Sequence, residues 1–286
     1  MVKKFVYGTP FETEAVVKEI PSSEGNPDYD TFSTENGFSF TTKLADDDMV
    51  FGLGEANRGI NKRGFLYISD CADDPNHVES KTSLYAAHNF IIISGKTHVG
   101  FFFDYPGTLR FDIGYTTSDT MTVSCENADL YVYMITGDSD LDIVKQFRGI
   151  IGRSYIAPKF AFGYGQSRWG YKTEDDFRTV VKKYRENHVP LDMVYMDIDY
   201  MQDYKDFTVN EERFPDFEGF VQDMKKEKIH LVPIIDAGVK VEKGYDIYEE
   251  GCEKGYFCRR EDGSYFEATV WPGWTHFPDV LNADAR

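Results

Sequence analysis

Short apolar stretches separated by turn residues fill the first half of the chain. Val, Ile, Phe and Tyr are concentrated in segments such as 90–93, 99–103 and 130–134. Turns rich in glycine and proline interrupt these segments at roughly the 8–12-residue spacing of an antiparallel sandwich. An apolar period of 3.6 residues is first sustained from Leu141 onward. Residues 1–157 are therefore predicted to form an all-β sandwich that closes with a short helix near 139–150.

After Pro158 the pattern alternates strands with helices. Apolar segments that predict strands occupy 161–167, 193–196 and 231–235. The two intervening helices have apolar positions spaced i, i+3, i+4, i+7, which are Phe177, Val180, Val181 and Tyr184, then Phe217, Phe220, Val221 and Met224. Thr173 and Asp176 have the spacing of a capping box that opens the first helix. Repeated units of this kind predict a parallel sheet with right-handed crossovers.

Residues 158–286 are about half of the roughly 250 residues that a complete (β/α)8 barrel takes. Three parallel strands also leave two edges without partners, and such edges promote aggregation. We therefore expect this α/β half to be a partial TIM barrel that contains about the first three strands. The remainder of a longer protein, or a second chain, is expected to complete it.

The charge balance excludes some classes of partner. The sequence carries 31 Lys and Arg against 49 Asp and Glu, a formal net charge of -18, and this field repels a phosphate backbone. Nucleic acid is therefore not expected as a partner. No apolar run of about 18 residues is present, and the first residues lead into Glu12 and Glu14 rather than an apolar signal segment. We expect no membrane association and a cytoplasmic location.

The spacing of cysteine and histidine predicts neither a disulfide framework nor a metal site. The cysteines at 71, 125, 252 and 258 are sparse and lack C-x-x-C spacing, so reduced and mostly buried thiols are expected. The six histidines show no ligand motif such as H-E-x-x-H. The Gly-rich stretches 51–55 and 163–165 lack the further residues of a phosphate loop and are expected to serve tight backbone packing. These patterns predict neither a metal site nor a phosphate-binding loop.

Aromatic or acidic residues follow each predicted strand of the α/β half. Trp169 comes after the first strand, Asp197 and Asp199 follow the second, and Asp236 follows the third. Because ligands bind outside the carboxyl ends of parallel strands, these residues are expected to converge on one rim. A carboxylate can accept hydrogen bonds from vicinal hydroxyls, and an aromatic face can pack on the C–H face of a sugar. The arrangement favours a carbohydrate ligand.

The same residues also have structural explanations. An aspartate at a strand end can cap the next helix or pair with a surface lysine, and a tryptophan is commonly a core residue. Asp197 and Asp199 are two apart, so in a strand they face the same side, and a like-charged pair is costly unless a ligand, an arginine or hydrogen bonds compensate. The pair therefore favours a ligand-binding role for these two aspartates over a purely structural one. Trp271 and Trp274 lie in a loop-like stretch beside Pro272-Gly273, where burial is less expected.

Several ordered motifs cover most of the chain after residue 50. They are Phe51-Gly52-Leu53-Gly54-Glu55, Leu84-Tyr85-Ala86-Ala87-His88-Asn89-Phe90, Phe162-Gly163-Tyr164-Gly165-Gln166-Ser167-Arg168-Trp169-Gly170-Tyr171, Asp197-Ile198-Asp199-Tyr200-Met201 with Phe207-Thr208 and Phe214-Pro215, and Val270-Trp271-Pro272-Gly273 with Phe277-Pro278-Asp279. Each motif alone is weak, but together and in this order they are specific. The set resembles glycoside hydrolase family 31, which contains the retaining α-glucosidases and their relatives.

The resemblance implies a β-sandwich followed by a (β/α)8 catalytic barrel that acts on non-reducing α-linked glucose. Asp197 matches the aspartate that hydrogen-bonds sugar hydroxyls in the -1 pocket of this family, and Ile198 matches the residue beside it on that wall. Trp169 matches an aromatic position, Ile235 lies near the expected pocket floor, and Trp271 matches a stacking tryptophan.

The resemblance also implies that a loop of the sandwich carries an aspartate into the pocket. Within the segment 69–75, Asp73 is the expected counterpart, with Asp70 and Asp74 as alternatives. The expected substrate-binding residues are therefore Asp197, Trp169, Asp73, Ile198, Ile235, Trp271 and Asp199.

One departure from the family concerns catalysis. The nucleophile of the family lies in a W-x-D-M-N-E segment and the general acid/base is a later aspartate, and neither motif occurs in this sequence. Retaining hydrolysis needs two carboxyl groups about 5–5.5 Å apart. No catalytic residue is therefore assigned. The pair is expected beyond Arg286, and residues 1–286 alone are expected to be inactive.

Three functions follow as hypotheses. The first is an exo-acting retaining α-glucosidase that releases glucose from the non-reducing ends of α-linked gluco-oligosaccharides, to which this chain contributes substrate-binding residues. It is expected to need neither a metal ion nor an organic cofactor. The second is a catalytically silent sugar-binding protein. The third is the same chemistry on an α-xyloside or α-galactoside. Linkage preference and homo-oligomer formation are left open by the sequence.

Overall fold

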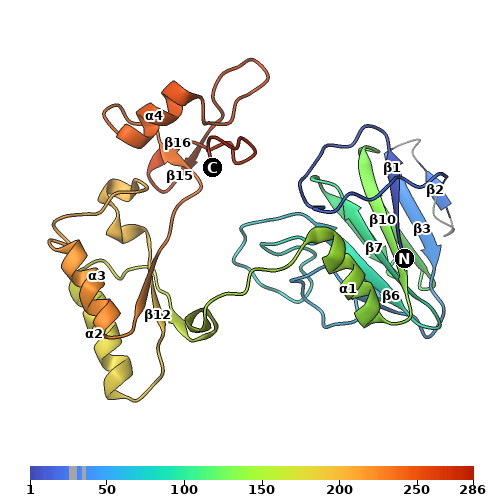
Figure 1. Cartoon of the computed structure of the whole chain (residues 1–286), viewed down its shortest axis with the longest axis horizontal. Coiled ribbons are helices and arrows are strands. Elements are labelled where there is room, and N and C mark those ends of the chain that lie inside the picture. Colours follow the sequence, from blue (N-terminus) through green and yellow to red (C-terminus); the bar gives the residue numbers. More distant parts are fainter. Residues whose placement is uncertain (26–30, 34–36) are drawn as a thin grey trace. The chain divides into compact units, whose positions relative to one another are not determined.

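The computed structural model describes residues 1–25, 31–33 and 37–286, with only the backbone considered for 31–33. It divides into two compact units, Met1–Tyr155 and Ile156–Arg286. Figure 1 shows the elements of both units, and each unit is treated by itself below.

The first unit is a sandwich of two five-stranded antiparallel sheets. One sheet has the order β1-β10-β7-β6-β4, formed by β1 (Val2–Tyr7), β4 (Met49–Gly52), β6 (Phe90–Ser94), β7 (His98–Asp104) and β10 (Leu130–Gly137). The other has the order β2-β3-β9-β8-β5, formed by β2 (Thr31–Ser33), β3 (Phe38–Lys43), β5 (Phe65–Ser69), β8 (Leu109–Ile113) and β9 (Thr120–Cys125). The strands predicted at 90–93, 99–103 and 130–134 lie within β6, β7 and β10. The all-β prediction is confirmed.

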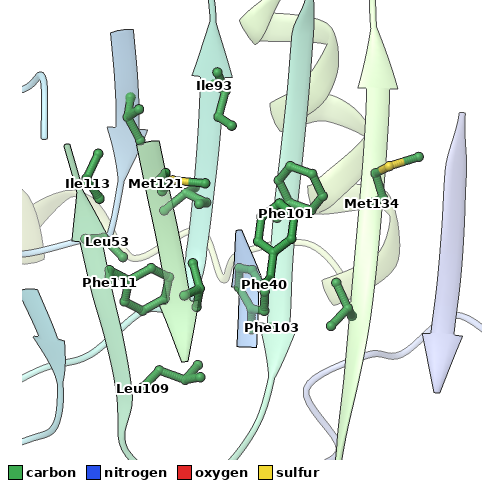
Figure 2. Packing of buried hydrophobic residues seen from close by; sticks show 14 of the residues in the cluster. Phe40, Leu53, Ile93, Phe101, Phe103, Leu109, Phe111, Ile113, Met121 and Met134 are labelled. Carbon is green, nitrogen blue, oxygen red and sulfur yellow. The ribbon is translucent and has the colours of Figure 1, made fainter. Parts of the chain in front are cut away.

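The core of this unit lies between the two sheets and is rich in phenylalanine. Phe101 and Phe103 from β7 face Phe40 from β3 and Phe111 from β8, and all four are fully buried (Figure 2). The Phe40 and Phe101 rings lie 4.8 Å apart, and the Phe103 and Phe111 rings meet edge to face at 5.8 Å. Burial of this apolar area is the main force that holds the sheets together.

The helix α1 (Asp140–Ile151) covers the outer face of the first sheet. The Ser139 side chain accepts the Asp142 N–H and caps its start. On its inner side Ile143 and Ile150 are buried, and the Phe147 ring stacks on Phe90 of β6 with centroids 3.8 Å apart. The sheet is therefore covered on both faces, which explains why β6 is apolar almost throughout rather than alternating.

The Gly-rich segment 51–55 serves close backbone packing, as predicted. Gly52 has φ +124°, and a Cβ placed on it would lie 2.2 Å from the Phe90 carbonyl oxygen. Gly54 has φ +60°, and a Cβ there would lie 2.1 Å from the His88 ring. Only glycine fits these two positions.

The second unit begins with a three-stranded parallel sheet of order β11-β12-β13. Its elements are β11 (Gly165–Gln166), α2 (Glu174–Glu186), β12 (Met193–Met196), α3 (Phe217–Lys226) and β13 (His230–Pro233). The predicted capping box is present, because Thr173 and Asp176 bond each other's backbone N–H groups. Phe177 and Val181 of α2, and Phe220 and Met224 of α3, are buried as their spacing predicted. The sheet does not close into a barrel, in agreement with the partial TIM barrel that the sequence predicted.

Two of the predicted strands differ from the structure. Of 161–167, only Gly165–Gln166 pairs with β12, and Lys159–Phe162 forms a 3-10 turn, η1. Gly165 permits this pairing because a Cβ there would lie 2.8 Å from the Tyr195 ring. The third strand ends at Pro233 rather than residue 235, because its partner β12 ends at Met196, the residue that pairs with Pro233.

The remainder of the second unit contains a small antiparallel sheet that was not predicted. It has the order β14-β16-β15, formed by β14 (Val239–Lys240), β15 (Glu267–Val270) and β16 (Gly273–His276), and it lies beside α4 (Asp246–Lys254). The supposed loop around Trp271 is thus the turn of a β-hairpin, and Trp274 lies on β16. Buried His276 packs against the rings of Tyr248, Phe257 and Tyr265, which anchors the hairpin.

All four cysteines are unpaired thiols. The expectation that most are buried was wrong, since Cys71 is exposed and Cys125, Cys252 and Cys258 are only half-buried. Among the described residues, no helix has the length and apolar character needed to cross a membrane.

Candidate functional site

The carboxyl ends of β11, β12 and β13 lie at one edge of the parallel sheet. Gln166 pairs with Val194, and Met196 pairs with Pro233. The polypeptide that follows each strand therefore leaves from the same edge, as the sequence predicted for the rim. Asp197 directly follows β12, and Asp236 lies three residues after the end of β13.

Asp197 is half-buried and begins a 3-10 turn, η2 (Ile198–Tyr200). Its Oδ1 accepts the Ile198 N–H at 2.7 Å, so the capping explanation holds for one of its oxygens. The strand has ended at Met196, and the expectation that Asp197 and Asp199 share one side of a strand was wrong. The turn separates the two carboxylates instead.

Asp199 is 1% exposed and is engaged with Arg213. Its Oδ1 lies 3.6 Å from Arg213 Nη1, and the same nitrogen donates to the Asp199 carbonyl at 2.8 Å. Within the described part of the chain, Asp199 Oδ2 has no hydrogen-bond partner. The arginine compensates the buried charge, so Asp199 ties η2 to the segment that precedes α3.

Asp236 and Asp206 form a second pair of carboxylates. The Asp236 N–H donates to Asp206 Oδ1 at 2.9 Å. Burial raises the pKa of Asp206 to about 6, and the neighbouring Asp236 charge adds to that rise. Burial also raises the pKa of Asp236, and the charge of Asp197 raises it further. Asp236 therefore lies close enough to interact electrostatically with Asp197 and with Asp206.

The predicted apolar contacts divide into buried and exposed side chains. Ile198 is 6% exposed and belongs to the interior, whereas Ile235 is 51% exposed. Trp169 and Trp271 are 66% and 70% exposed, so the core explanation does not hold for either. In the described part of the chain neither tryptophan makes a ring contact with another aromatic side chain.

The loop that carries Trp169 starts from a network around Gln166. Gln166 Oε1 accepts the Tyr184 hydroxyl at 2.6 Å and the Tyr164 hydroxyl at 3.0 Å, while Gln166 Nε2 donates to the Tyr171 hydroxyl at 3.1 Å. The Tyr184 hydroxyl also donates to the Tyr164 hydroxyl at 3.4 Å, and this bond raises the pKa of Tyr184 to about 12. The network fixes both ends of the segment 166–171, and the Trp169 ring extends from it into solvent.

The predicted aspartates of the sandwich lie in the first unit, between β5 and β6. Asp74 is bound to Lys81 at 3.0 Å and accepts the Asn76 N–H at 3.0 Å, and these bonds lower its pKa. Asp70 and Asp73 are exposed, and their carboxylates bond no other described residue. The assignment of Asp73 stays a prediction, and Asp74 has the weakest case of the three because its charge is already compensated.

Sequence reasoning missed Asp206 and Tyr245. The Tyr245 hydroxyl donates to the Asp206 carbonyl at 2.7 Å, in a buried position. Both residues lie in irregular segments, where hydrophobic periodicity carries no signal. The only available clue was that Asp206 precedes the Phe207-Thr208 motif.

The chemistry of this edge is that of carboxylates able to accept hydrogen bonds. Asp236 Oδ2 is buried and bonds none of the described residues. No group of three or more His, Cys, Asp and Glu side chains in the described ranges is arranged to hold a metal ion. Hydroxyl groups of a ligand are donors that these oxygens could accept.

Two family models match the chain. The model for the glycosyl hydrolases family 31 TIM-barrel domain matches residues 154–286, and that for the glycosyl hydrolase 31 N-terminal galactose mutarotase-like domain matches residues 10–112. The two matches occur in the order expected from the fold.

Curated relatives are similar over most of this chain. Alpha-glucosidase 2 of Bacillus thermoamyloliquefaciens is 35% identical over 85% of the chain, and Glucoamylase 1 of Candida albicans is 32% identical over 91%. The alpha-glucosidase of Saccharolobus solfataricus is 28% identical over 83%. The chain spans only 31%, 28% and 34% of the length of these three proteins.

Solved structures share the fold. The DNJ-bound glucosidase II alpha subunit gives a TM-score of 0.78 at 24% identity, over 87% of this chain and 29% of that one. A family 31 dextranase of Flavobacterium johnsoniae, complexed with isomaltotriose, gives 0.80 at 23% identity, over 88% and 31%.

Proposed function

The chain belongs to glycoside hydrolase family 31, and we propose that it forms the sandwich and the first part of the catalytic barrel of an exo-acting retaining α-glucosidase. The substrate would be an α-linked gluco-oligosaccharide, from which glucose is released at the non-reducing end. The names of its relatives support this substrate class, since two of the three described above are alpha-glucosidases.

In this proposal the edge of the parallel sheet binds one sugar residue. Asp197 has one oxygen engaged with its own turn, which leaves Oδ2 to accept a sugar hydroxyl. Asp236 Oδ2, which is buried and bonds none of the described residues, would contribute a second acceptor once the substrate enters. The exposed rings of Trp169 and Trp271 would pack against sugar faces once the substrate enters.

We assign neither the nucleophile nor the general acid/base to a residue of this chain. Asp199 is buried against Arg213, so it cannot attack an anomeric carbon in this arrangement. Asp197 serves binding, and the carboxyl pair of retaining hydrolysis would come from another part of the barrel. The chain supplies recognition rather than the bond-breaking groups.

The observation that carries the proposal is the position of Asp197 and Asp236. They follow neighbouring parallel strands at the edge where ligands bind in barrels, and their charges are close enough to interact. Two like charges held close together are costly unless a ligand, a cation or hydrogen bonds compensate them, and Asp236 Oδ2 has no hydrogen-bond partner among the described residues.

The first experiment measures the reaction of the whole protein. Release of nitrophenol from nitrophenyl α-glucoside, α-xyloside and α-galactoside is compared, and the glucoside is expected to be the best substrate. A preference for another glycoside would replace the sugar but keep the chemistry. Glucose binding without any nitrophenol release would favour a silent sugar-binding protein.

The second experiment replaces Asp197. Asp197→Ala is expected to lower kcat/KM by at least about 10²-fold, because a charge-assisted hydrogen bond contributes about 1.5–3 kcal/mol and contributes more in the transition state. Asp175→Asn, on the exposed side of α2, is the matched control and should behave like the wild type. Wild-type kinetics for Asp197→Ala would remove Asp197 from the sugar site.

A further inference from the structure

Asp206 is a buried carboxylate on a loop that meets the end of β13. It is 2% exposed, and it lies between the 3-10 turn η3 (Gln202–Tyr204) and α3. Its Oδ1 accepts the Asp236 N–H at 2.9 Å, and its own carbonyl accepts the Tyr245 hydroxyl at 2.7 Å. The side chain and backbone of one residue therefore bind two other segments of the second unit.

The loop around Asp206 is held in an unfavourable backbone conformation. Asp203, Tyr204 and Phe207 have φ values of +52°, +58° and +61°, in the left-handed region that non-glycine residues seldom adopt. The Phe207 side chain is 66% exposed, so burial of its ring does not offset the backbone strain. Strain of this kind persists only where surrounding bonds fix it, and it gathers at functional sites.

Ion pairs and hydrogen bonds fix this loop on both sides of Asp206. Lys205 Nζ lies 2.8 Å from Glu242, which also binds Lys240 at 2.7 Å. Thr208 Oγ1 accepts the Gln202 N–H at 2.9 Å and donates to the Lys205 carbonyl. The two lysines lower the pKa of Glu242 to about 2, so this clamp stays charged over the whole neutral range.

The segment that Asp206 binds carries residues of the proposed sugar site. The Tyr200 hydroxyl donates to the Ile234 carbonyl at 3.0 Å, and Asp206 accepts the N–H two residues later, at Asp236. These two bonds flank Ile235. Together they determine where the chain leaves β13.

We propose that Asp206 is a positioning residue for the sugar site, which by accepting the Asp236 N–H holds the Asp236 carboxylate and Ile235 in place beside Asp197. The inference rests on the proposed function. Asp206 contacts no substrate in this role. It acts through the backbone of Asp236.

A carboxylate suits this role better than a neutral acceptor. A hydrogen bond to an ionised acceptor is roughly twice as strong as one between neutral groups. The arrangement is costly for stability, because the groups that face Asp206 are Asp236, Tyr200 and Tyr245 and none of them is a cation. Holding the end of β13 accounts for a buried charge that stability alone would not favour.

The test compares Asp206→Ala and Asp206→Asn in the whole protein. Asp206→Ala removes the acceptor and is expected to lower kcat/KM on nitrophenyl α-glucoside at least tenfold. Asp206→Asn keeps an oxygen acceptor for the same N–H but makes a weaker bond, so it is expected to lose only about threefold in kcat/KM. Glu211→Ala, an exposed residue of the following turn, is the control and should leave the kinetics unchanged.

Hydrogen exchange measures how strongly the bond to Asp206 protects the Asp236 amide. In Asp206→Ala the Asp236 amide is expected to exchange at least tenfold faster than in the wild type, while amides of β12 keep their protection. Loss of protection throughout the unit would mean that the variant is misfolded, and the decision then rests on Asp206→Asn, whose Asp236 amide must stay protected.

The inference is overturned if Asp206→Ala exposes the Asp236 amide but keeps wild-type kcat/KM. It is also overturned if Asp206→Asn is as inactive as Asp206→Ala while both remain folded, since the acceptor would then not be what matters. A wild-type protein that releases nitrophenol from none of the glycosides refutes the proposed function instead. That result is visible before any variant is made.

Discussion

The raised pKa of Asp206 predicts how the stability of the second unit depends on pH. The pKa of this carboxyl rises from 3.8 to about 6 because the group is buried. The folded protein therefore holds this proton more tightly than the unfolded chain does. The resulting stabilisation is fully present below the unfolded pKa and is lost as the pH rises through about 6.

The shift sets the size of the effect. A rise of about two pKa units corresponds to about 3 kcal/mol, at about 1.4 kcal/mol for each unit. Roughly a third of this is already lost at pH 4.5, because the unfolded carboxyl is mostly ionised there. Between pH 4.5 and pH 7.5 the wild type should therefore lose about 2 kcal/mol relative to Asp206→Asn, which has no proton to release at this position.

The assay is native-state hydrogen exchange of the peptide that covers residues 230–238, in the whole protein at both pH values. Comparing the two proteins at the same pH cancels the intrinsic exchange rates and the other carboxyl groups. Asp175→Asn serves as the control and should show no pH-dependent difference from the wild type. Equal differences between wild type and Asp206→Asn at both pH values would refute the reasoning, because Asp206 would then not be the titrating group.

Two predictions concern the sandwich. Phe103→Ala should lower the free energy of unfolding by about 3–5 kcal/mol, since the ring is fully buried among other phenylalanines. Urea denaturation measures this change. As the control, Tyr115→Ala at an exposed position should change the free energy of unfolding by no more than about 0.5 kcal/mol. Gly52→Ala should cost more than Gly64→Ala in the same assay, because both have positive φ but only the Cβ at 52 would collide with backbone. Equal costs for either pair would contradict the packing described above.

The elements that could be predicted are those whose burial repeats along the chain. The strand at 193–196 was predicted residue for residue, because it is a short apolar run between polar segments. The inner face of α2 was predicted from Phe177 and Val181, since a helix repeats its buried side every three or four residues. Local sequence is sufficient to predict an element that is buried throughout or that buries one face against a single core.

The antiparallel sheet after β13 could not be predicted in this way. Its strands have two to four residues, too few for a period to be visible. Trp274 lies on a strand yet is 61% exposed, so its apolar character did not mark a buried position. Pairing between distant segments, rather than local pattern, determines this part of the fold.

The candidate site was predictable only in part, for a related reason. The position of Asp197 and Asp236 follows from the topology of parallel strands, which the alternation of elements revealed. The role of Asp206 depends on partners 30 and 39 residues away, Asp236 and Tyr245. No spacing rule connects them, and Asp199 was misplaced because a turn replaced the expected strand.

The left-handed residues of the 203–207 loop have a consequence for protein engineering. A screen that selects only for heat resistance would favour glycine or asparagine at 204 and 207, since each relieves a backbone penalty of about 1–2 kcal/mol. Those replacements would also allow the loop to relax away from β13. Under the proposal that Asp206 positions the sugar site, thermostable variants obtained by that route would gain melting temperature and lose affinity for sugar. A selection that includes turnover would then keep the unfavourable tyrosine and phenylalanine.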